Sequence, residues 1–352
     1  MRASSRFYLL NSFVFVIVCF LLYFVVITRR LETEQLKISD VLFEPSKEHS
    51  NVDYNVWLIF TKVTNKSTLT FKFQNLISNL LNVSTVPLKF HIIVDEKSKT
   101  IAKYKLSEVV YSLNKSLVYT FYNVQDCSTK LSDIVNVMTP FFSSRPGTYF
   151  SDALFYISLG LYRIAPSSQK RGILLDCDLY FKKDIALLFD EFDRFKPTAL
   201  YGLAPELTPV YRHILHMYKL KHNTTFGDYY CDNSITEGIH PHGFQGYNSG
   251  VVLIDFEKQR ESKQYLQMIS RESIKNMTEK YRFRGHLGDQ DFYTLLGYEH
   301  PDLIQTLNCG FNRQLCTWWK DHGYSDIFKH YFQCNHSIVV LHGNCNTRIP
   351  KN

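Results

Sequence analysis

The segment Gly172-Ile173-Leu174-Leu175-Asp176-Cys177-Asp178 decides the fold that the sequence predicts. Its first four residues form an apolar run typical of a buried strand, and two aspartates follow at the carboxyl end of that strand. Open α/β sheets bind ligands in the crevice beyond the carboxyl ends of their strands. The chain can leave strand geometry there and direct both carboxylates at one hard cation, which prefers oxygen ligands. A solvated turn is the alternative interpretation.

Further apolar strands are predicted on both sides of this segment, at residues 55–63, 88–95, 117–124, 198–204 and 247–256. Helical stretches alternate with them, most clearly at residues 152–164, 257–267 and 288–296. Such alternation predicts an α/β fold with a mostly parallel central sheet that is flanked by helices. After Pro301 little periodicity remains, apart from a short strand at residues 337–341. We therefore expect one doubly wound domain with an irregular C-terminal section.

Two other segments carry side chains suited to a site. Asp289 and Asp291 repeat the Asp-x-Asp spacing but are predicted to begin a helix, where residues two apart do not face each other. One of them is expected to cap the helix or to face a substrate. His342 follows a short strand, and its imidazole is a suitable ligand for Mn²⁺ beside carboxylates. A structural histidine that binds no metal is the plainer interpretation of a single His.

The overall composition excludes disorder, collagen and coiled coil, since 45% of the residues are hydrophobic and 21% are charged. The net charge is +7, and more than half of that excess lies near the N-terminus. The body is therefore nearly neutral, so we expect no nucleic-acid partner. The N-terminal positive charges belong to Arg2, Arg6, Arg29 and Arg30.

An uncharged apolar run between those arginines predicts a membrane anchor. Residues 7–27, at about 1.5 Å per residue, would span a hydrocarbon core of roughly 30 Å. We expect residues 1–6 to form a short cytoplasmic tail, residues 7–27 a transmembrane signal-anchor helix and residues 28–54 a lumenal stem. A cleaved signal peptide is the alternative, but its apolar stretch is shorter and ends at a small-residue site.

Sequons and cysteines both favour an oxidising, lumenal compartment. Four cysteines crowd near the C-terminus, where two disulfides could form; a zinc site is the alternative, although no C-x-x-C pair is present. Three connectivities are open, and we favour Cys309–Cys334 with Cys316–Cys345. Cys127 and Cys231 could form a further bridge or remain thiols. The six sequons begin at Asn65, Asn82, Asn114, Asn223, Asn276 and Asn335.

Four motifs in order resemble the glycogenin-like retaining glycosyltransferases, family eight of the GT-A fold. The motifs are LDCD at residues 175–178, YNSGV at 247–251, GDQD at 288–291 and HG at 342–343. The resemblance covers about residues 55–350 and implies a GT-A catalytic domain over residues 55–352. It also implies a UDP-sugar donor and a divalent metal, Mn²⁺, with Mg²⁺ as the alternative.

Residues 281–292, 312–319, 321–326 and 342–347 are similar to members of that family with a narrower activity. The resemblance implies transfer of xylose from UDP-xylose, in α-1,3 linkage, to the xylose of xylose-glucose O-glycans on EGF-like repeats of Notch-type proteins. It implies a type II protein of the endoplasmic reticulum membrane, with the Golgi as the alternative. Oligomeric state stays open, with a homodimer as one option. The alternative hypotheses for the function are a UDP-glucose or UDP-galactose transferase and a non-catalytic lumenal binding protein.

The family pattern assigns expected roles to individual residues. Asp176, Asp178 and His342 would bind the metal, while Asp289 and Gln290 would lie beside the reacting sugar as catalytic residues. Acceptor contacts are expected from Tyr211, Arg212, Trp318 and Trp319, although tryptophan pairs more often belong to a core. Residues expected to contact the donor are Phe60, Thr61, Lys62, Cys177, Asn248, Ser249, Leu287, Gln290 and Asn344.

One departure from the family pattern concerns the donor diphosphate. Many members follow the His-Gly segment with Lys-Pro-Trp, whose lysine meets the diphosphate, whereas residues 344–350 here read NCNTRIP. Arg348 or backbone N–H groups near Asn344 are the candidates for that contact.

The mechanism of retention also needs an explanation. A retaining enzyme is expected to use a carboxylate nucleophile, but Gln290 occupies the position where that carboxylate would be expected. We therefore favour front-face substitution.

Overall fold

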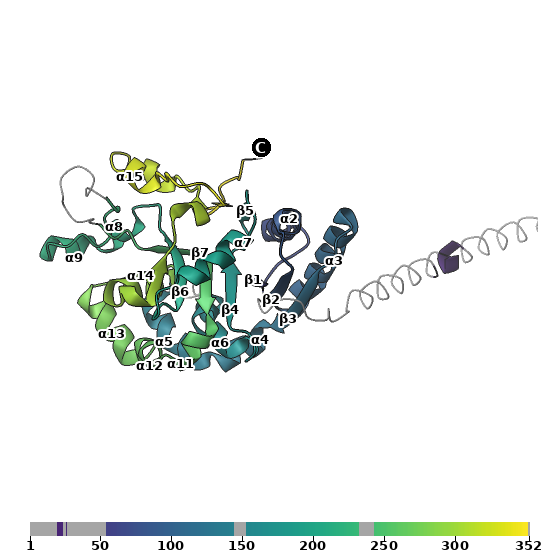
Figure 1. The fold of residues 1–352 in the computed structure, drawn as a ribbon, viewed down its shortest axis with the longest axis horizontal. Coiled ribbons are helices and arrows are strands. Elements are labelled where there is room, and N and C mark those ends of the chain that lie inside the picture. Colours follow the sequence, from purple (N-terminus) through teal and green to yellow (C-terminus); the bar gives the residue numbers. More distant parts are fainter. Residues whose placement is uncertain (1–19, 24–25, 27–53, 144–152, 232–242, 351–352) are drawn as a thin grey trace, which may run out of the picture. The chain divides into compact units, whose positions relative to one another are not determined.

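The computed structural model describes residues 20–23, 26, 54–143, 153–231 and 243–350 (Figure 1). By its internal contacts the chain divides into two units, Met1–His49 with Ser116–Val118 and Ser50–Lys115 with Tyr119–Asn352. The predicted tail, almost all of the predicted anchor and the predicted stem up to residue 53 lie outside the described residues. Within the described part, no helix combines the length and the apolar character needed to cross a bilayer.

The central sheet of the larger unit has the strand order β3-β2-β1-β4-β7-β6-β8 in the described part of the chain (Figure 1). All six predicted strands of this sheet are confirmed, and β8 is an addition in the section expected to be irregular. The bounds are Tyr54–Phe60 (β1), Leu88–Val94 (β2), Val118–Asn123 (β3), Arg171–Leu175 (β4), Tyr201–Pro205 (β6), Tyr247–Asp255 (β7) and Ile304–Thr306 (β8).

One strand reverses the direction of this mostly parallel sheet, and the reversal shapes the site. β1 runs parallel to β2 and β4, and β6 runs parallel to β8, whereas β7 is antiparallel to both β4 and β6. Asn248, near the beginning of β7, pairs with Ala204 at the end of β6. The N–H of Asp176, just beyond β4, donates to the carbonyl of Gly250 at 2.9 Å. Polar residues at the start of β7 therefore join the crevice at the carboxyl ends of its neighbours.

Helices cover the sheet, and side chains mark where several of them begin. Asp95 caps α3 by accepting from the Ser98 N–H. Ser262 caps α12 in the same way and splits the predicted helix 257–267 into α11 and α12. The bounds are Thr68–Val83 (α2), Glu96–Leu113 (α3), Val124–Lys130 (α4), Ser132–Phe142 (α5), Ile157–Ile164 (α6), Ala186–Asp190 (α7), Val210–Ile214 (α8), His216–Lys221 (α9), Phe256–Glu261 (α11), Lys263–Met268 (α12), Arg271–Lys280 (α13), Asp289–Glu299 (α14) and Phe328–Phe332 (α15).

Aromatic residues dominate the core beneath the site. Trp57 on β1 is fully buried and stacks on His91 of β2, with ring centroids 4.5 Å apart. The hydroxyls of Tyr201 and Tyr265 hydrogen-bond at 2.6 Å, which satisfies two polar groups in the interior. Burying each large side chain contributes about 1.5–3 kcal/mol. The sheet thus forms a rigid floor on which the polar residues at its edge are held.

A second, three-stranded sheet carries the C-terminal section back to the crevice. β10 (Val340–His342) pairs antiparallel with β5 (Leu179–Phe181) and parallel with β9 (Arg313–Gln314). The favoured disulfides Cys309–Cys334 and Cys316–Cys345 are both confirmed. Cys127 is a buried thiol, so the further bridge to Cys231 is not formed. Because β5 begins directly after Asp178, this pairing brings His342 to the end of β4.

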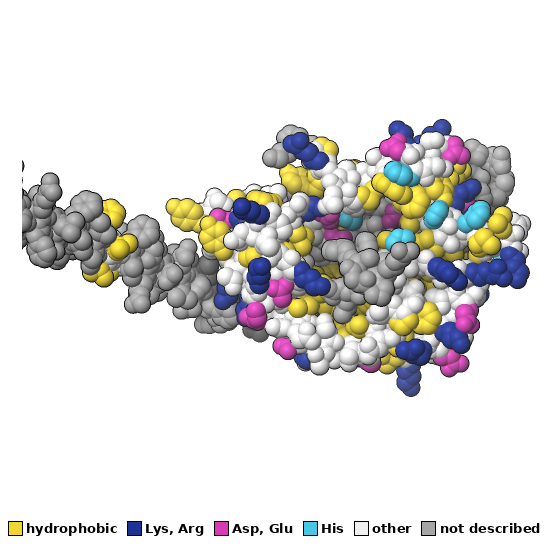
Figure 2. All heavy atoms as spheres, turned by 180° about the vertical axis from the view of Figure 1, so that it is seen from behind, with side chains coloured by type: hydrophobic (Ala, Val, Ile, Leu, Met, Phe, Trp, Pro, Cys, Tyr) yellow, Lys and Arg dark blue, Asp and Glu magenta, His cyan; other side chains and the backbone are white. Residues whose placement is uncertain are grey.

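The surface of the described part has two features relevant to the sequence predictions. Figure 2 shows a recess in which histidine and acidic side chains are visible, beside residues drawn in grey. Around it, basic and acidic side chains are interspersed with hydrophobic ones. All six sequon asparagines are exposed and can accept a glycan without displacing the core: Asn65, Asn82, Asn114, Asn223, Asn276 and Asn335.

Candidate active site

The first Asp-x-Asp segment and His342 converge at the carboxyl end of β4. One ligand atom from each of Asp176, Asp178 and His342 lies within 4.8 Å of the others. His342 Nε2 is 3.3 Å from an Asp178 carboxylate oxygen and 3.6 Å from an Asp176 oxygen. The Asp176 side chain is 58% exposed, whereas that of His342 is 4% exposed. The group therefore forms the bottom of an open site instead of a closed structural metal cage.

Two contacts orient the imidazole of His342. Its Nδ1 lies 2.9 Å from the side-chain oxygen of Asn312, so Nδ1–H donates and Nε2 is left to face the carboxylates. Gly250 lies directly against the ring, and a Cβ added there would be 2.2 Å from Cε1. Any larger residue at position 250 would push the ring out of place. Asn312 and Gly250 thus fix which nitrogen is offered to a cation.

The charges of the three residues fit a divalent metal. Although burial acts to raise it, the hydrogen bond from His342 and the nearby Lys72 charge hold the pKa of Asp178 below its usual range. Burial acts to lower the pKa of His342, but the two carboxylates raise it overall. Two carboxylate oxygens and one oriented imidazole nitrogen form a donor set suited to Mn²⁺ or a similar cation. A proton bridging these groups would leave when a cation binds.

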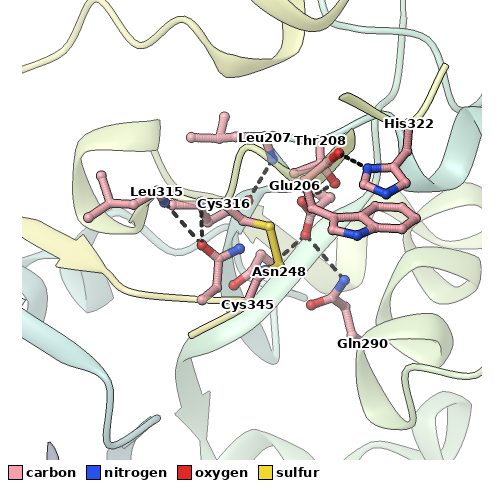
Figure 3. The surroundings of a disulfide bond; sticks show 12 residues. Glu206, Leu207, Thr208, Asn248, Gln290, Leu315, Cys316, His322 and Cys345 are labelled. Atoms are coloured by element: carbon pink, nitrogen blue, oxygen red, sulfur yellow. Dashed lines mark hydrogen bonds between the residues drawn. A yellow bond between two sulfur atoms is a disulfide. The ribbon is translucent and has the colours of Figure 1, made fainter. Parts of the chain in front are cut away.

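A buried carboxylate, Glu206, lies behind the metal ligands and just beyond β6. Its two oxygens accept from Asn248 Nδ2 at 2.8 Å, from Gln290 Nε2 at 3.2 Å and from the Thr208 hydroxyl at 2.7 Å. Figure 3 shows the side chains of Asn248 and Gln290 converging on Glu206 near the Cys316–Cys345 disulfide. Burial raises the pKa of Glu206, while the bonds from Asn248 and Thr208 oppose that effect.

This network joins the metal ligands to Gln290. The Asn248 oxygen accepts from the Asn312 amide at 2.8 Å, and Asn312 in turn holds His342. At the other end, Glu206 accepts from the amide nitrogen of Gln290, so the Gln290 oxygen is directed away from Glu206 and lies 3.3 Å from the Ser249 N–H. The orientation of the Gln290 amide is therefore determined by its partners.

The second Asp-x-Asp segment begins α14, as predicted, and its two carboxylates have separate partners. Asp289 accepts from the Ser158 hydroxyl at 2.5 Å, and burial raises its pKa to about 7. Asp291 is fully buried and accepts from the Leu287 N–H at 2.7 Å and from the Tyr211 hydroxyl at 3.0 Å. Asp291 therefore holds the turn before α14, and Asp289 is the member left beside Gln290.

Comparison with known proteins identifies relatives that share sequence with most of this chain. No protein-family model matches the chain. Xyloside xylosyltransferase 1 from Mus musculus is 40% identical over 306 residues, which are 85% of this chain and 76% of that protein. The Homo sapiens protein of the same name is 40% identical over 307 residues, 85% of this chain and 75% of that protein. The chain belongs to the xyloside xylosyltransferase family.

A solved structure from the xyloside xylosyltransferase family supports the fold. The crystal structure of the mouse protein in its apo form matches with a TM-score of 0.77 at 40% identity. The match covers 85% of this chain and 100% of that one. The GT-A fold expected from the motif order is therefore confirmed, with its disulfide-tied C-terminal section.

The donor-binding residues expected from the family pattern lie along one edge of the sheet, with differing exposure. Phe60 is fully buried and stacks on Phe73, so its side chain belongs to the core. Thr61 is buried, and exposed Lys62 has a left-handed backbone whose N–H donates to Asp95. The buried Cys177 thiol lies 3.7 Å from the carbonyl of Ile59.

Four further donor-site candidates take part in holding the site together. The Asn248 side chain is engaged at both ends by protein groups, whereas Ser249 is partly exposed. The Leu287 N–H is bonded to Asp291. The Asn344 oxygen accepts the N–H groups of Leu315 and Cys316 at 3.0 and 2.9 Å. Asn248 and Asn344 therefore act on protein partners, and the Ser249 hydroxyl hydrogen-bonds to the Asp289 carboxylate.

The four candidate acceptor residues differ sharply. Tyr211 is fully buried with its hydroxyl on Asp291, so its side chain presents no surface to an acceptor, contrary to expectation. Arg212 is partly exposed and paired with Asp228. Trp319 is half-buried against His213 and Tyr324. Trp318 is 51% exposed and stacks on His322 with ring centroids 3.7 Å apart.

Sequence reasoning missed Glu206, Asn312, Ser158 and Lys72. Glu206 could have been found, because it lies two residues beyond one predicted strand, and Asp176 lies directly beyond another. Asn312 contacts His342, 30 residues away, and Ser158 contacts Asp289, 131 residues away. A local sequence pattern does not predict contacts over such separations. This chain thus contains a supporting network that its motifs alone do not show.

Proposed function

We propose that the protein transfers xylose from UDP-xylose, with retention and in α-1,3 linkage, to the xylose of xylose-glucose O-glycans on EGF-like repeats of Notch-type proteins. The supporting observation is the 40% identity to two xyloside xylosyltransferases, combined with the convergence of Asp176, Asp178 and His342. A metal held there, Mn²⁺ in the proposal, would stabilise the negative charge on the leaving diphosphate. Asp289 and Gln290 would lie beside the xylose.

We assign retention to front-face substitution, in which the leaving phosphate oxygen helps to deprotonate the acceptor hydroxyl. Glu206 is an unsuitable nucleophile because protein donors occupy both of its oxygens. Gln290 suits stabilisation instead: Glu206 takes its amide N–H, so its oxygen can face positive charge that develops on the sugar. Near-full turnover in Gln290→Ala, or a sugar adduct trapped on Asp289, would contradict this assignment.

For the acceptor we propose that Trp318 is the aromatic platform, since its ring is exposed and held by His322. Aromatic faces pack well on the apolar faces of sugars. Trp318→Ala is expected to raise KM for a xylose-glucose acceptor by about tenfold and to leave KM for the donor within twofold. A parallel rise in both constants would assign Trp318 to folding instead.

The proposed location is the lumen of the endoplasmic reticulum, with residues 7–27 as a type II anchor. Exposed sequons and two disulfides support a lumenal body, because both depend on the secretory pathway. Protease protection in microsomes, together with endoglycosidase H sensitivity, tests this. Digestion of the body in sealed microsomes would contradict it, and endoglycosidase resistance would favour the Golgi.

The activity itself is tested by one assay. Purified protein is incubated with UDP-xylose and a xylose-glucose acceptor, with Mn²⁺ or with EDTA, and linkage is read by NMR. We expect metal-dependent α-1,3 transfer and at least tenfold lower rates with UDP-glucose and UDP-galactose, because a pocket fitted to xylose excludes the hydroxymethyl group. Preference for a hexose donor would overturn the donor assignment, and absence of nucleotide binding would favour a non-catalytic protein.

A further inference from the structure

A lysine outside all the motifs reaches the metal carboxylates. Lys72, near the start of α2, places its Nζ 3.2 Å from an Asp178 oxygen and 3.1 Å from the side-chain oxygen of Asn346. The side chains of Lys72 and Asp178 are only 24% and 20% exposed. This ammonium group is therefore part of the crevice and not a freely solvated surface charge.

Both ends of this contact are held in place. The next residue, Phe73, is fully buried and stacks on Phe60 at the end of β1, so the backbone that carries Lys72 is anchored to the sheet. On the other side, Cys345 and Asn346 have left-handed backbones, and Cys345 is joined to Cys316. The Lys72 ammonium group thus contacts a constrained loop. Because both groups are already held in place, less conformational entropy is lost when they bind a ligand.

The loop in question follows His342-Gly343, and residues 344–350 of this chain contain no lysine. Lys72 donates to Asn346, within that loop. A positive charge thus reaches this position from a different element of the fold. The other candidate cation of the segment, Arg348, is exposed.

We propose that Lys72 binds the diphosphate of the nucleotide-sugar donor; this inference rests on the proposed function. Two carboxylates already balance the charge of a divalent cation, so the diphosphate needs a further positive partner. When a cation takes Asp178, Lys72 is released from that carboxylate and its three N–H donors turn to the phosphate oxygens. Lysine is a common phosphate ligand, and contacts between ionised groups are the stronger class of hydrogen bond.

The test uses the full chain in detergent and calorimetric binding of UDP and of uridine in Mn²⁺. Lys72→Met keeps the length of the side chain and removes its charge, and Lys72→Arg restores the charge. Lys263→Met, on an exposed lysine of α12, is the matched control. We expect Lys72→Met to weaken UDP binding about tenfold or more, with uridine unchanged, partial recovery in Lys72→Arg and no effect in the control.

A second readout separates this role from a structural one. Without nucleotide, Lys72→Met is expected to bind Mn²⁺ several-fold more tightly, because a positive charge 3.2 Å from Asp178 has been removed. A change that merely loosened the site would weaken Mn²⁺ and UDP together. Opposite signs for the two ligands are therefore the signature of the proposal.

Three results would overturn it. The first is UDP affinity in Lys72→Met within twofold of the unmodified chain, and the second is an equal loss for UDP and uridine. The third is a UDP-selective loss in Arg348→Met but not in Lys72→Met, which would assign the diphosphate to Arg348. If the unmodified chain itself shows no Mn²⁺-dependent UDP binding, the proposed function fails and the role of Lys72 fails with it.

Discussion

Asp176/Asp178 and Asp289/Asp291 share one spacing and have opposite surroundings. The first pair follows a strand, opens towards solvent and meets His342. The second pair begins a helix, is buried, and has partners made of hydroxyls and a backbone N–H. Identical spacing therefore gives two convergent carboxylates in one place and two divergent ones in the other.

The backbone explains the difference. Beyond β4 the chain turns at once into β5, so residues 176 and 178 both face the C-terminal strand β10. At the start of α14 the helix rotates each residue by about 100° from the last, so residues 289 and 291 point to different sides. A motif of two carboxylates acquires its chemistry from the path of the chain that carries it.

The largest effect is expected from removing the charge of the first pair. Asp176→Asn with Asp178→Asn should abolish measurable Mn²⁺ binding and lower turnover by about a thousandfold or more, because the cation loses both carboxylate ligands. Calorimetry and the transfer assay measure this, with the exposed Asp193→Asn as the control. Turnover within tenfold of normal would remove the functional distinction between the two pairs.

Asp291→Ala should instead unfold the protein more easily. It leaves the buried Tyr211 hydroxyl and the Leu287 N–H without their partner, at a cost of about 3 kcal/mol in the free energy of unfolding. Urea denaturation measures the loss, and Mn²⁺ affinity of the folded fraction should stay within a few-fold. Unchanged stability with lost metal binding would place Asp291 in the site.

Asn312→Ala tests how far the first pair depends on an oriented histidine. Without the Asn312 oxygen, His342 can expose either ring nitrogen, and Mn²⁺ affinity should fall about 10–100-fold. His342→Ala gives the upper limit of the effect in the same titration. Equal affinity in Asn312→Ala and the unmodified chain would show that Gly250 and the β10 register suffice.

The smallest effect is expected from Asp289→Asn. Burial raises the pKa of Asp289 to about 7, so the folded chain holds a proton there that the unfolded chain releases above about pH 4. This group therefore contributes less stability as pH rises from about 4 to 7. Asparagine mimics the protonated acid, so the variant should melt a few degrees above the unmodified chain at pH 8, with a smaller difference at pH 5. A gap of the same size at both pH values would contradict the shift.

Much of this architecture was predictable because it is encoded locally. The apolar runs of β1, β2 and β4 are bounded by polar residues, and the carboxyl end of a strand is where a ligand site is expected. The four cysteines near the C-terminus allow only three disulfide connectivities, and the observed one was among them. The reversed direction of β7 was not predictable, because the apolar pattern of a buried strand does not show whether it runs parallel or antiparallel to its neighbours.

The supporting residues escaped prediction for a different reason. Tyr211 carries the same aromatic ring as any sugar-binding tyrosine, and only the buried carboxylate of Asp291 shows that it faces inward. Lys72 and Asp178 are 106 residues apart, and their contact exists only after α2 has packed on the sheet. Such contacts are products of tertiary packing, and no window along the chain contains both partners.

The Cys316–Cys345 disulfide links two segments of the candidate site. It closes three residues beyond His342 and two residues before Trp318, so one covalent link steadies both the third metal ligand and the exposed ring. In a reducing cytoplasm that link does not persist, although the apolar sheet can still collapse. The sheet would then form without this restraint on His342 and Trp318, so the arrangement of these two residues depends on oxidation of the cysteine pair.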